Sequence, residues 1–355
     1  MTAQDAISLL EQMIAIPSVS RSEEQVANFL YGYLQKQGVD VHRHYNNIWA
    51  MGNHYDPSRK TLLLNSHIDT VKPSAAYTNN PYLPVNDDDR LYGLGSNDAG
   101  ASVVSLLTAF CNLYDVELPF NIILLLGAEE EVMGEHGMRA MVPFFQEQNI
   151  AIDMALVGEP TGLDAAVGER GLVVLDCVAN GIQGHAARNE GINAIYKALE
   201  DIETIRHDHF DRTSSLLGDI KMTTTMIEAG MQHNVVPDKC HFVVDIRTTD
   251  AYTNEEVVAM LQTDLQSDVT PRSMRIRASA ISETHPLVQA AIVLGRKTYV
   301  SPTTSDMALM PFPSLKLGVG QSFRSHSANE YVLKSEIAEG VDFYNQYINK
   351  LSDII

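Results

Sequence analysis

The first residues in the chain that could do chemistry are His67 and Asp69. They follow residues 61–64, Thr-Leu-Leu-Leu, a run with the composition of a buried strand. Residues two apart on an extended segment point the same way, so this histidine and this carboxylate can converge on one spot. In one interpretation His67 binds a metal while a carboxylate orients its ring. In the other, both are solvated loop residues, which is the commoner case for an isolated pair.

Two further acidic positions follow along the chain. Asp98 lies in the glycine-rich stretch 91–100 and precedes an apolar helix expected over 101–113. Residues 120–126 form an apolar run that ends in three glutamates, 129–131. Alone, Asp98 could belong to a simple turn and the glutamates to a solvated helix face. Ligand sites in open α/β sheets lie beyond the carboxyl ends of strands, which favours a functional site here.

A third buried strand is predicted over residues 154–157, and Glu159 follows it. His326 lies far along the chain in the segment SFRSHSANEYV. Together with His67, Asp98 and one of the three glutamates, these residues supply two imidazoles and three carboxylates. That set suits a pair of divalent ions, most naturally two Zn²⁺ with Co²⁺ or Mn²⁺ as substitutes. Because no thiolate takes part, a structural zinc ribbon is excluded.

The elements around these residues divide the chain into two predicted domains. Residues 1–165 and 280–355 alternate helices and strands and would carry the metal site. Residues 166–279 would form an inserted α+β domain with strands at 172–179, 220–227 and 242–247 and helices at 192–205 and 254–265. In the larger domain, further helices are expected over residues 2–16, Ser22 to Gly38, 138–148, 285–299 and 334–351. Further strands are expected over residues 39–42, 48–51 and 314–318. A long loop is expected over residues 72–89, near the site.

Composition narrows the classes of partner. The chain has 355 residues, 45% of them hydrophobic, and a formal charge of −20, which would repel nucleic acid and anionic lipid. Its first residues lack the basic and apolar regions of a signal peptide, and its longest apolar run is too short to span a bilayer. The three cysteines are widely spaced in apolar surroundings, as expected of reduced thiols. We therefore expect a cytoplasmic protein without nucleic-acid or membrane partners.

Five segments resemble the metal-site motifs of one enzyme family in order: SHIDTV, GLGSNDAG, GAEEEV, GEPT and SHSANEYV, spanning residues 66–332. The family is that of the co-catalytic zinc deacylases and exopeptidases typified by acetylornithine deacetylase and succinyl-diaminopimelate desuccinylase. The resemblance implies a zinc-exopeptidase-like α/β domain with a mostly parallel mixed sheet, helices on both faces, and an inserted α+β lid and dimerisation domain. It also implies that His67, Asp98 and Glu159 hold one zinc. Asp98, Glu131 and His326 would hold the other, with Asp98 bridging.

The same resemblance assigns roles to the remaining residues of the motifs. Asp69 would orient His67, Glu130 would be the general base, and Glu129 would be a supporting residue. A cis peptide bond is expected at Asp98-Ala99. Two departures from the family pattern leave the substrate open: the lysine common two positions after the bridging aspartate is absent, and three glutamates replace a frequent Asp-Glu-Glu.

The inserted domain carries three further positions that resemble family motifs. His185, in Gly-Ile-Gln-Gly-His, would reach across a homodimer interface and stabilise the oxyanion in the partner's site. Asn234 and Arg247 would bind substrate, since the planar guanidinium suits a carboxylate. The alternative for Arg247 is a salt bridge with Asp245 or Asp250.

The resemblance favours removal of an acetyl or succinyl group from a small amino acid such as ornithine or citrulline, in arginine biosynthesis, closest in character to acetylornithine deacetylase. The two enzyme alternatives are succinyl-diaminopimelate desuccinylase and a di- or tripeptidase. A non-catalytic metal-binding scaffold is a third alternative, and the presence of Glu130 argues against it.

Overall fold

The computed structural model describes residues 1–188, 190–207 and 210–355 and divides into two compact units. The first comprises Met1–Val167, Ile281–Tyr299 and Ser305–Ile355, and the second Gly168–Ala280 and Val300–Thr304. Residues 300–304 were predicted to belong to the larger domain, but they group with the second unit. They begin within β16 (Thr298–Ser301), which pairs with β8 (Ala165–Glu169), the strand at which the chain enters the second unit.

The first unit is built on a mixed sheet whose central strands are parallel. Strands β6, β3, β7 and β17 lie side by side in parallel, whereas β1, β2 and β8 add antiparallel pairs at the two sides. The bounds are β1 (Val41–His44), β2 (Asn47–Met51), β3 (Thr61–His67), β6 (Asn121–Gly127), β7 (Met154–Val157) and β17 (Ser314–Lys316). Every residue of β3, β6 and β7 is buried, as expected of central strands covered on both faces. The predicted α/β class is confirmed.

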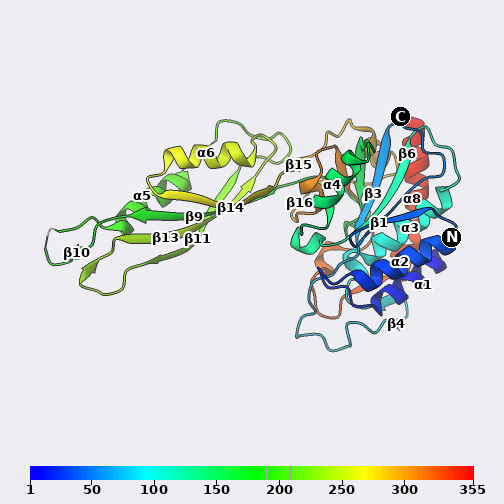
Figure 1. The fold of residues 1–355 in the computed structure, drawn as a ribbon, viewed down its shortest axis with the longest axis horizontal. Helices are drawn as coiled ribbons and strands as arrows, with labels where there is room; N and C mark the ends of the chain where they lie inside the picture. The colour runs from blue at the N-terminus through cyan, green and yellow to red at the C-terminus, as the bar shows by residue number, and fades with distance from the viewer. Residues whose placement is uncertain (189, 208–209) are drawn as a thin grey trace. The chain divides into compact units, whose positions relative to one another are not determined.

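Helices cover both faces of this sheet, with α4 on one side and α3 and α8 on the other (Figure 1). The helices are α1 (Ala3–Ile14), α2 (Glu24–Lys36), α3 (Ala101–Leu113), α4 (Met138–Glu147), α7 (Pro286–Val293) and α8 (Lys334–Ile354). The apolar side of α4 packs through Met141 and Phe145 on Leu63 and Ile123 of the sheet.

Two helix predictions for this unit were wrong in detail. The helix expected from Ser22 to Gly38 is shorter, because Glu23 occupies the cap position of α2 and turns its carboxylate to the backbone N–H of Arg21. The helix expected over 285–299 ends at Val293, since Gly295 adopts a left-handed conformation (φ +80°) and the following residues form β16. By contrast, α1 begins near the expected position, with a capping box formed by Thr2 and Asp5.

A second, smaller sheet and a tight turn lie next to the segment that carries Asp98. Strands β4 (Val85–Asp87), β5 (Arg90–Tyr92) and β18 (Tyr331–Leu333) form a small antiparallel sheet, so the end of the predicted 72–89 loop is a strand. The Asp98-Ala99 peptide bond is cis, which confirms the expectation from the motif.

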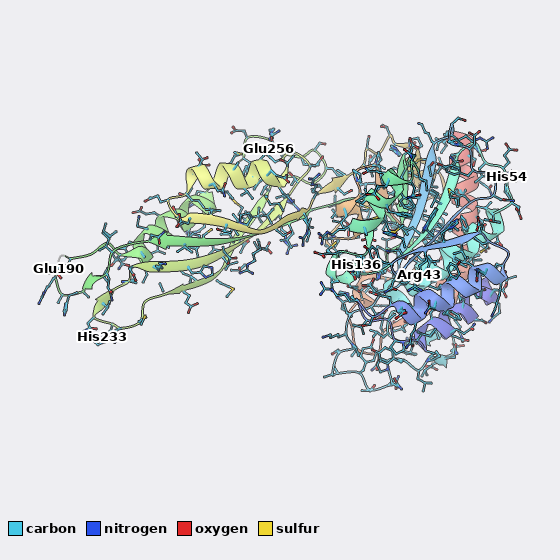
Figure 2. The ribbon with its side chains drawn as sticks, in the orientation of Figure 1. Arg43, His54, His136, Glu190, His233 and Glu256 are labelled. Carbon is cyan, nitrogen blue, oxygen red and sulfur yellow. The ribbon has the colours of Figure 1, made fainter. Side chains whose placement is uncertain are left out.

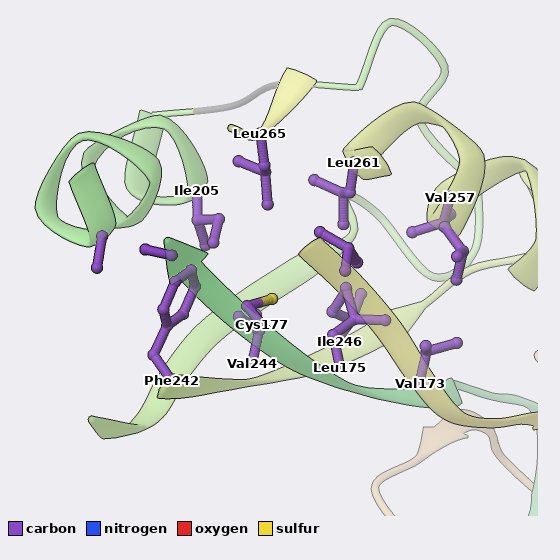
Figure 3. Close-up of a cluster of buried hydrophobic side chains, with 14 of the residues drawn as sticks. Val173, Leu175, Cys177, Ile205, Phe242, Val244, Ile246, Val257, Leu261 and Leu265 are labelled. Atoms are coloured by element: carbon purple, nitrogen blue, oxygen red, sulfur yellow. The ribbon is translucent and has the colours of Figure 1, made fainter. Parts of the chain in front are cut away.

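The second unit is a four-stranded antiparallel sheet with two helices. The strands are β9 (Gly171–Asn180), β11 (Lys221–Ala229), β13 (Lys239–Thr248) and β14 (Asp268–Ile276), and they lie in the order β11-β13-β9-β14. The helices are α5 (Ala194–His207) and α6 (Asn254–Asp264). Side chains alternate along β9, and those on the buried face join α5 and α6 in one apolar core (Figure 3). Glu256, labelled in Figure 2, closes a capping box at the start of α6.

Strand β14 was not predicted. Pro271 and two arginines, Arg272 and Arg275, interrupt the apolar pattern of this strand, and an edge strand tolerates a proline. All three cysteines, Cys111, Cys177 and Cys240, are free thiols. Across the described residues, we find no helix that combines the length and the apolar character needed to cross a bilayer.

Phe242→Ala tests the core of the second unit. The ring is fully buried in the apolar core of this unit, so its loss should destabilise the unit by about 3–5 kcal/mol. Denaturant unfolding followed by circular dichroism measures the change, while fluorescence of Trp49, the single tryptophan, follows the first unit. Met226→Ala, at a 60% exposed position, is the control and should stay within about 0.5 kcal/mol. Equal effects of the two substitutions would show that the helices do not cover the sheet in this way.

Candidate metal centre

Three parallel strands deliver their polar residues to one edge of the sheet. His67 is the last residue of β3 and lies opposite Gly127, the last residue of β6. Glu130 and Glu131 follow β6 after a sharp turn, and Glu159 follows β7. Because the strands are parallel and in register, side chains from three distant parts of the sequence meet at this edge.

His67 is buried and points its Nε2 atom at carboxylates. This atom lies 3.2 Å from Asp98 Oδ1 and 3.7 Å from Glu159 Oε1. The other ring nitrogen, Nδ1, lies 2.9 Å from the backbone carbonyl oxygen of Asp69 and 3.5 Å from its Oδ1. Asp69 therefore faces the ring nitrogen with its backbone oxygen and, at a longer distance, with its carboxylate, and Nε2 is left to face a metal.

Asp98 lies between the two histidines. His326, on a left-handed residue of a loop, places its Nε2 3.6 Å from Asp98 Oδ2 and 3.0 Å from Glu131 Oε2. One oxygen of Asp98 thus faces His67 and the other faces His326. This is the arrangement needed for one carboxylate to be shared between two ions.

Glu130 and Glu131 complete the cluster. Ligand atoms of His67, Glu130 and Glu159 lie within 4.8 Å of one another, as do those of His67, Asp98 and Glu131. The donors are imidazole nitrogens and carboxylate oxygens, which suit zinc and similar divalent ions. The residues present therefore fit divalent ions. The first group contains Glu130, which was predicted to be the general base, and neither group contains His326, so the predicted division of ligands between two ions stays a prediction.

The charges in this cluster perturb one another strongly. Burial, and then the nearby carboxylates, raise the pKa of Glu159 to about 8 and the pKa of Glu130 well above its ordinary value. Burial opposes protonation of His67, yet Glu159, Asp69 and Asp98 hold its pKa well above the usual range. Without a cation, these carboxylates therefore tend to take up protons, and a bound cation would favour their charged forms instead.

The Asp69 carboxylate holds the glutamate turn in place. Its Oδ1 accepts the backbone N–H of Glu130 at 3.0 Å, and its Oδ2 accepts the N–H of Glu131 at 3.2 Å and the hydroxyl of Ser20 at 2.7 Å. Glu129, which is left-handed, instead accepts the N–H of His136 at 3.2 Å (His136 is labelled in Figure 2). Glu129 thus supports the turn, as the sequence suggested.

The other predicted site residues belong to the second unit. His185 is exposed on β10 (Gly184–His185), where its Nδ1 accepts the N–H of Ala187 at 3.1 Å. Asn234 is exposed and accepts the N–H of Ala186 through its backbone oxygen. Arg247 makes two hydrogen bonds to Asp245, at 2.8 and 3.1 Å, so the salt bridge left open by the sequence is formed. Substrate binding by these residues stays a prediction.

Sequence reasoning missed one residue beside the cluster. Glu330 is 2% exposed, and its carboxylate accepts backbone N–H groups of the loop that carries Asp98. Burial and the charge of Asp98 raise its pKa to about 8, while these hydrogen bonds act in the opposite direction. In the sequence, Glu330 could have been noticed as an acidic residue directly before the apolar strand β18 and four residues after His326.

Asp69→Ala should weaken metal binding. Without this carboxylate the N–H groups of Glu130 and Glu131 lose their acceptor and the glutamate turn is free to shift, so zinc affinity should fall about 10–100-fold. Competition with a chromogenic chelator measures the affinity. Ser20→Ala removes only one of the three donors to Asp69 and should cost less than about tenfold. Wild-type affinity in the Asp69 variant would contradict this role.

Comparisons with known proteins agree with this geometry. The family model described as peptidase family M20/M25/M40 matches residues 63–350. A succinyl-diaminopimelate desuccinylase of Ehrlichia canis is 24% identical, over 99% of this chain and 100% of its own. A peptidase M20 domain-containing protein of Schizosaccharomyces pombe is 27% identical over 96% of this chain and 84% of its own. The solved structure of a dinuclear metal-binding M20 peptidase of Bacillus subtilis superposes with a TM-score of 0.71 at 16% identity, covering 99% and 98% of the two chains. The chain therefore belongs to peptidase family M20/M25/M40 and is a metal-dependent amidohydrolase.

Proposed function

We propose that this protein hydrolyses the amide of an N-acyl amino acid, with an N-succinyl diamino acid such as N-succinyl-diaminopimelate as the first candidate substrate. The observation that supports hydrolysis most directly is the position of Asp98, with one oxygen toward each histidine and the buried Glu130 beside it. The desuccinylase relative, which matches along its whole length, supports the choice of acyl group.

The acidic cluster suits this reaction. When bound, two divalent ions would polarise the scissile carbonyl and make water more acidic. His67, Asp98 and Glu159 would hold one ion, and Asp98, Glu131 and His326 the other. Glu130 would accept a proton from the attacking water and deliver it to the nitrogen of the leaving amine. Without cations, burial and then Glu159 raise the pKa of Glu130. Bound cations would lower it again and leave the carboxylate able to accept a proton.

The acetylornithine reaction favoured by the sequence motifs becomes the second deacylase candidate. The Ehrlichia canis relative is named for the removal of a succinyl group from diaminopimelate, which favours lysine biosynthesis over arginine biosynthesis. Peptide hydrolysis is a further candidate, because the Schizosaccharomyces pombe relative is described as a peptidase-domain protein. A cytoplasmic location, also proposed, fits the three free thiols.

A substrate panel tests the proposal. Zinc-loaded protein is assayed for amine release from N-succinyl-diaminopimelate, N-acetylornithine, N-acetylcitrulline, a dipeptide and a tripeptide. We expect kcat/KM for the succinyl substrate to exceed the others by at least about tenfold. Cleavage of the peptides alone would replace the deacylase proposal with a peptidase.

Glu130→Gln is the matched variant for this panel. The amide keeps the size of the side chain but cannot carry the proton, so kcat should fall at least about 100-fold while metal content is unchanged. Retained hydrolysis in a metal-loaded variant would remove Glu130 from the role of base.

A homodimer formed through the second unit is part of the proposal, with His185 stabilising the oxyanion in the partner's site. Two individually inactive variants, Glu130→Gln and His185→Ala, are co-expressed with different tags. If His185 acts across the interface, mixed dimers contain one intact site, and the random mixture should recover about a quarter of wild-type activity. Mixed dimers that stay inactive would place His185 in its own subunit's site, whereas a His185→Ala variant that is active by itself would place His185 outside catalysis.

A further inference from the structure

Glu330 is a buried carboxylate that the proposed reaction does not use. Its Oε1 accepts the backbone N–H groups of Asn97 and Asp98, both at 2.8 Å, and its Oε2 accepts that of Gly95 at 3.0 Å. All three donors belong to the single turn that presents Asp98. A carboxylate buried this deeply is tolerated only when its oxygens are hydrogen-bonded, and here backbone N–H groups satisfy both.

The turn is shaped around this carboxylate. Gly95 adopts a left-handed conformation, with φ of +73°, and a Cβ at this position would overlap the methyl group of Thr70. Together with the following residues it forms a concave set of N–H groups, a backbone arrangement that binds anions. In this protein the anion is a side chain of the same molecule, and the N–H of Asp98 itself is one of the donors.

A second set of contacts joins the same turn to the loop before His326. The side-chain amide of Asn97 accepts the N–H of Gln321 at 2.8 Å and donates to its carbonyl oxygen at 3.1 Å. Glu330 lies four residues after His326 on the other side of that loop. The backbone that carries Asp98 is therefore held at two points by the segment that carries the second histidine.

We propose that Glu330 is a positioning residue of the metal centre, which sets the place of the Asp98 carboxylate between His67 and His326. This inference rests on the proposed metal centre. The distances of 3.2 Å from Asp98 Oδ1 to His67 and 3.6 Å from Asp98 Oδ2 to His326 depend on where the 95–98 backbone lies. If the turn shifts, Asp98 loses its bridging position, and both ions are affected.

Glu330→Gln tests the proposal. The side-chain amide places one NH₂ group where an acceptor is required, so at least one of the three N–H groups loses its partner and the turn must move. Zinc affinity, measured by chelator competition, should fall about 10–100-fold. In the cobalt-loaded protein the visible absorption bands should shift. The value of kcat should fall, with KM changed less than about twofold, because Glu330 would not touch substrate.

Asp201→Asn is the matched control. Asp201 is also 2% exposed and accepts two backbone N–H groups, those of Gln266 and Ser267, both at 2.9 Å, but it belongs to the second unit. Its replacement should lower thermal stability and leave zinc affinity and the cobalt spectrum unchanged. Glu330→Asp, which keeps the charge on a shorter side chain, serves if Glu330→Gln does not fold, and should also weaken zinc binding.

The outcomes separate this inference from the metal centre itself. A wild-type protein that binds no divalent ion would overturn the centre and the inference with it. Tight binding by wild type and by both Glu330 variants, with an unchanged cobalt spectrum, would overturn only the positioning role. Equal weakening by Asp201→Asn would also do so, because the effect would then follow general loss of stability.

Discussion

Repulsion among buried carboxylates is the constraint on which the arrangement of the first unit depends. Asp98, Glu130, Glu131 and Glu159 converge on two histidines, and burial together with their neighbours raises the pKa of Glu130, Glu131 and Glu159. Such a cluster opposes folding unless cations or protons neutralise it. The same clustered carboxylates that oppose folding in the absence of cations are the groups that would bind divalent ions.

Other carboxylates hold the cluster in position. Asp69 accepts the N–H groups of Glu130 and Glu131, and Glu330 accepts those of the turn that carries Asp98. Each of these two acids is buried and hydrogen-bonded to backbone, and each fixes residues proposed to contact a metal or its water. The sheet supplies the rest, since three parallel strands end at one edge and bring distant motifs together. Backbone hydrogen bonds to Asp69 and Glu330 thus position the site residues at the edge of the sheet.

Much of this could be predicted from the sequence, and the failures have physical causes. Apolar runs that end in acids or histidine identified β3, β6 and β7 because buried parallel strands are continuous in hydrophobicity. Strand β14 was missed since an edge strand tolerates the proline and charges that mask its pattern. The end of α7 depended on the left-handed conformation of Gly295, which spacing alone does not reveal. Glu330 and the backbone contact of Asp69 were missed because local sequence does not encode which N–H groups a carboxylate will meet.

The central claim is that Asp98 bridges two metal ions. An anomalous difference map from crystals of the zinc-loaded protein, recorded at the zinc absorption edge, tests it most directly. The account predicts two peaks on either side of the Asp98 carboxylate, one about 2.0–2.2 Å from ligand atoms of His67 and Glu159 and the other at that distance from His326 and Glu131. A single peak, or two peaks of which neither contacts Asp98, would contradict the account.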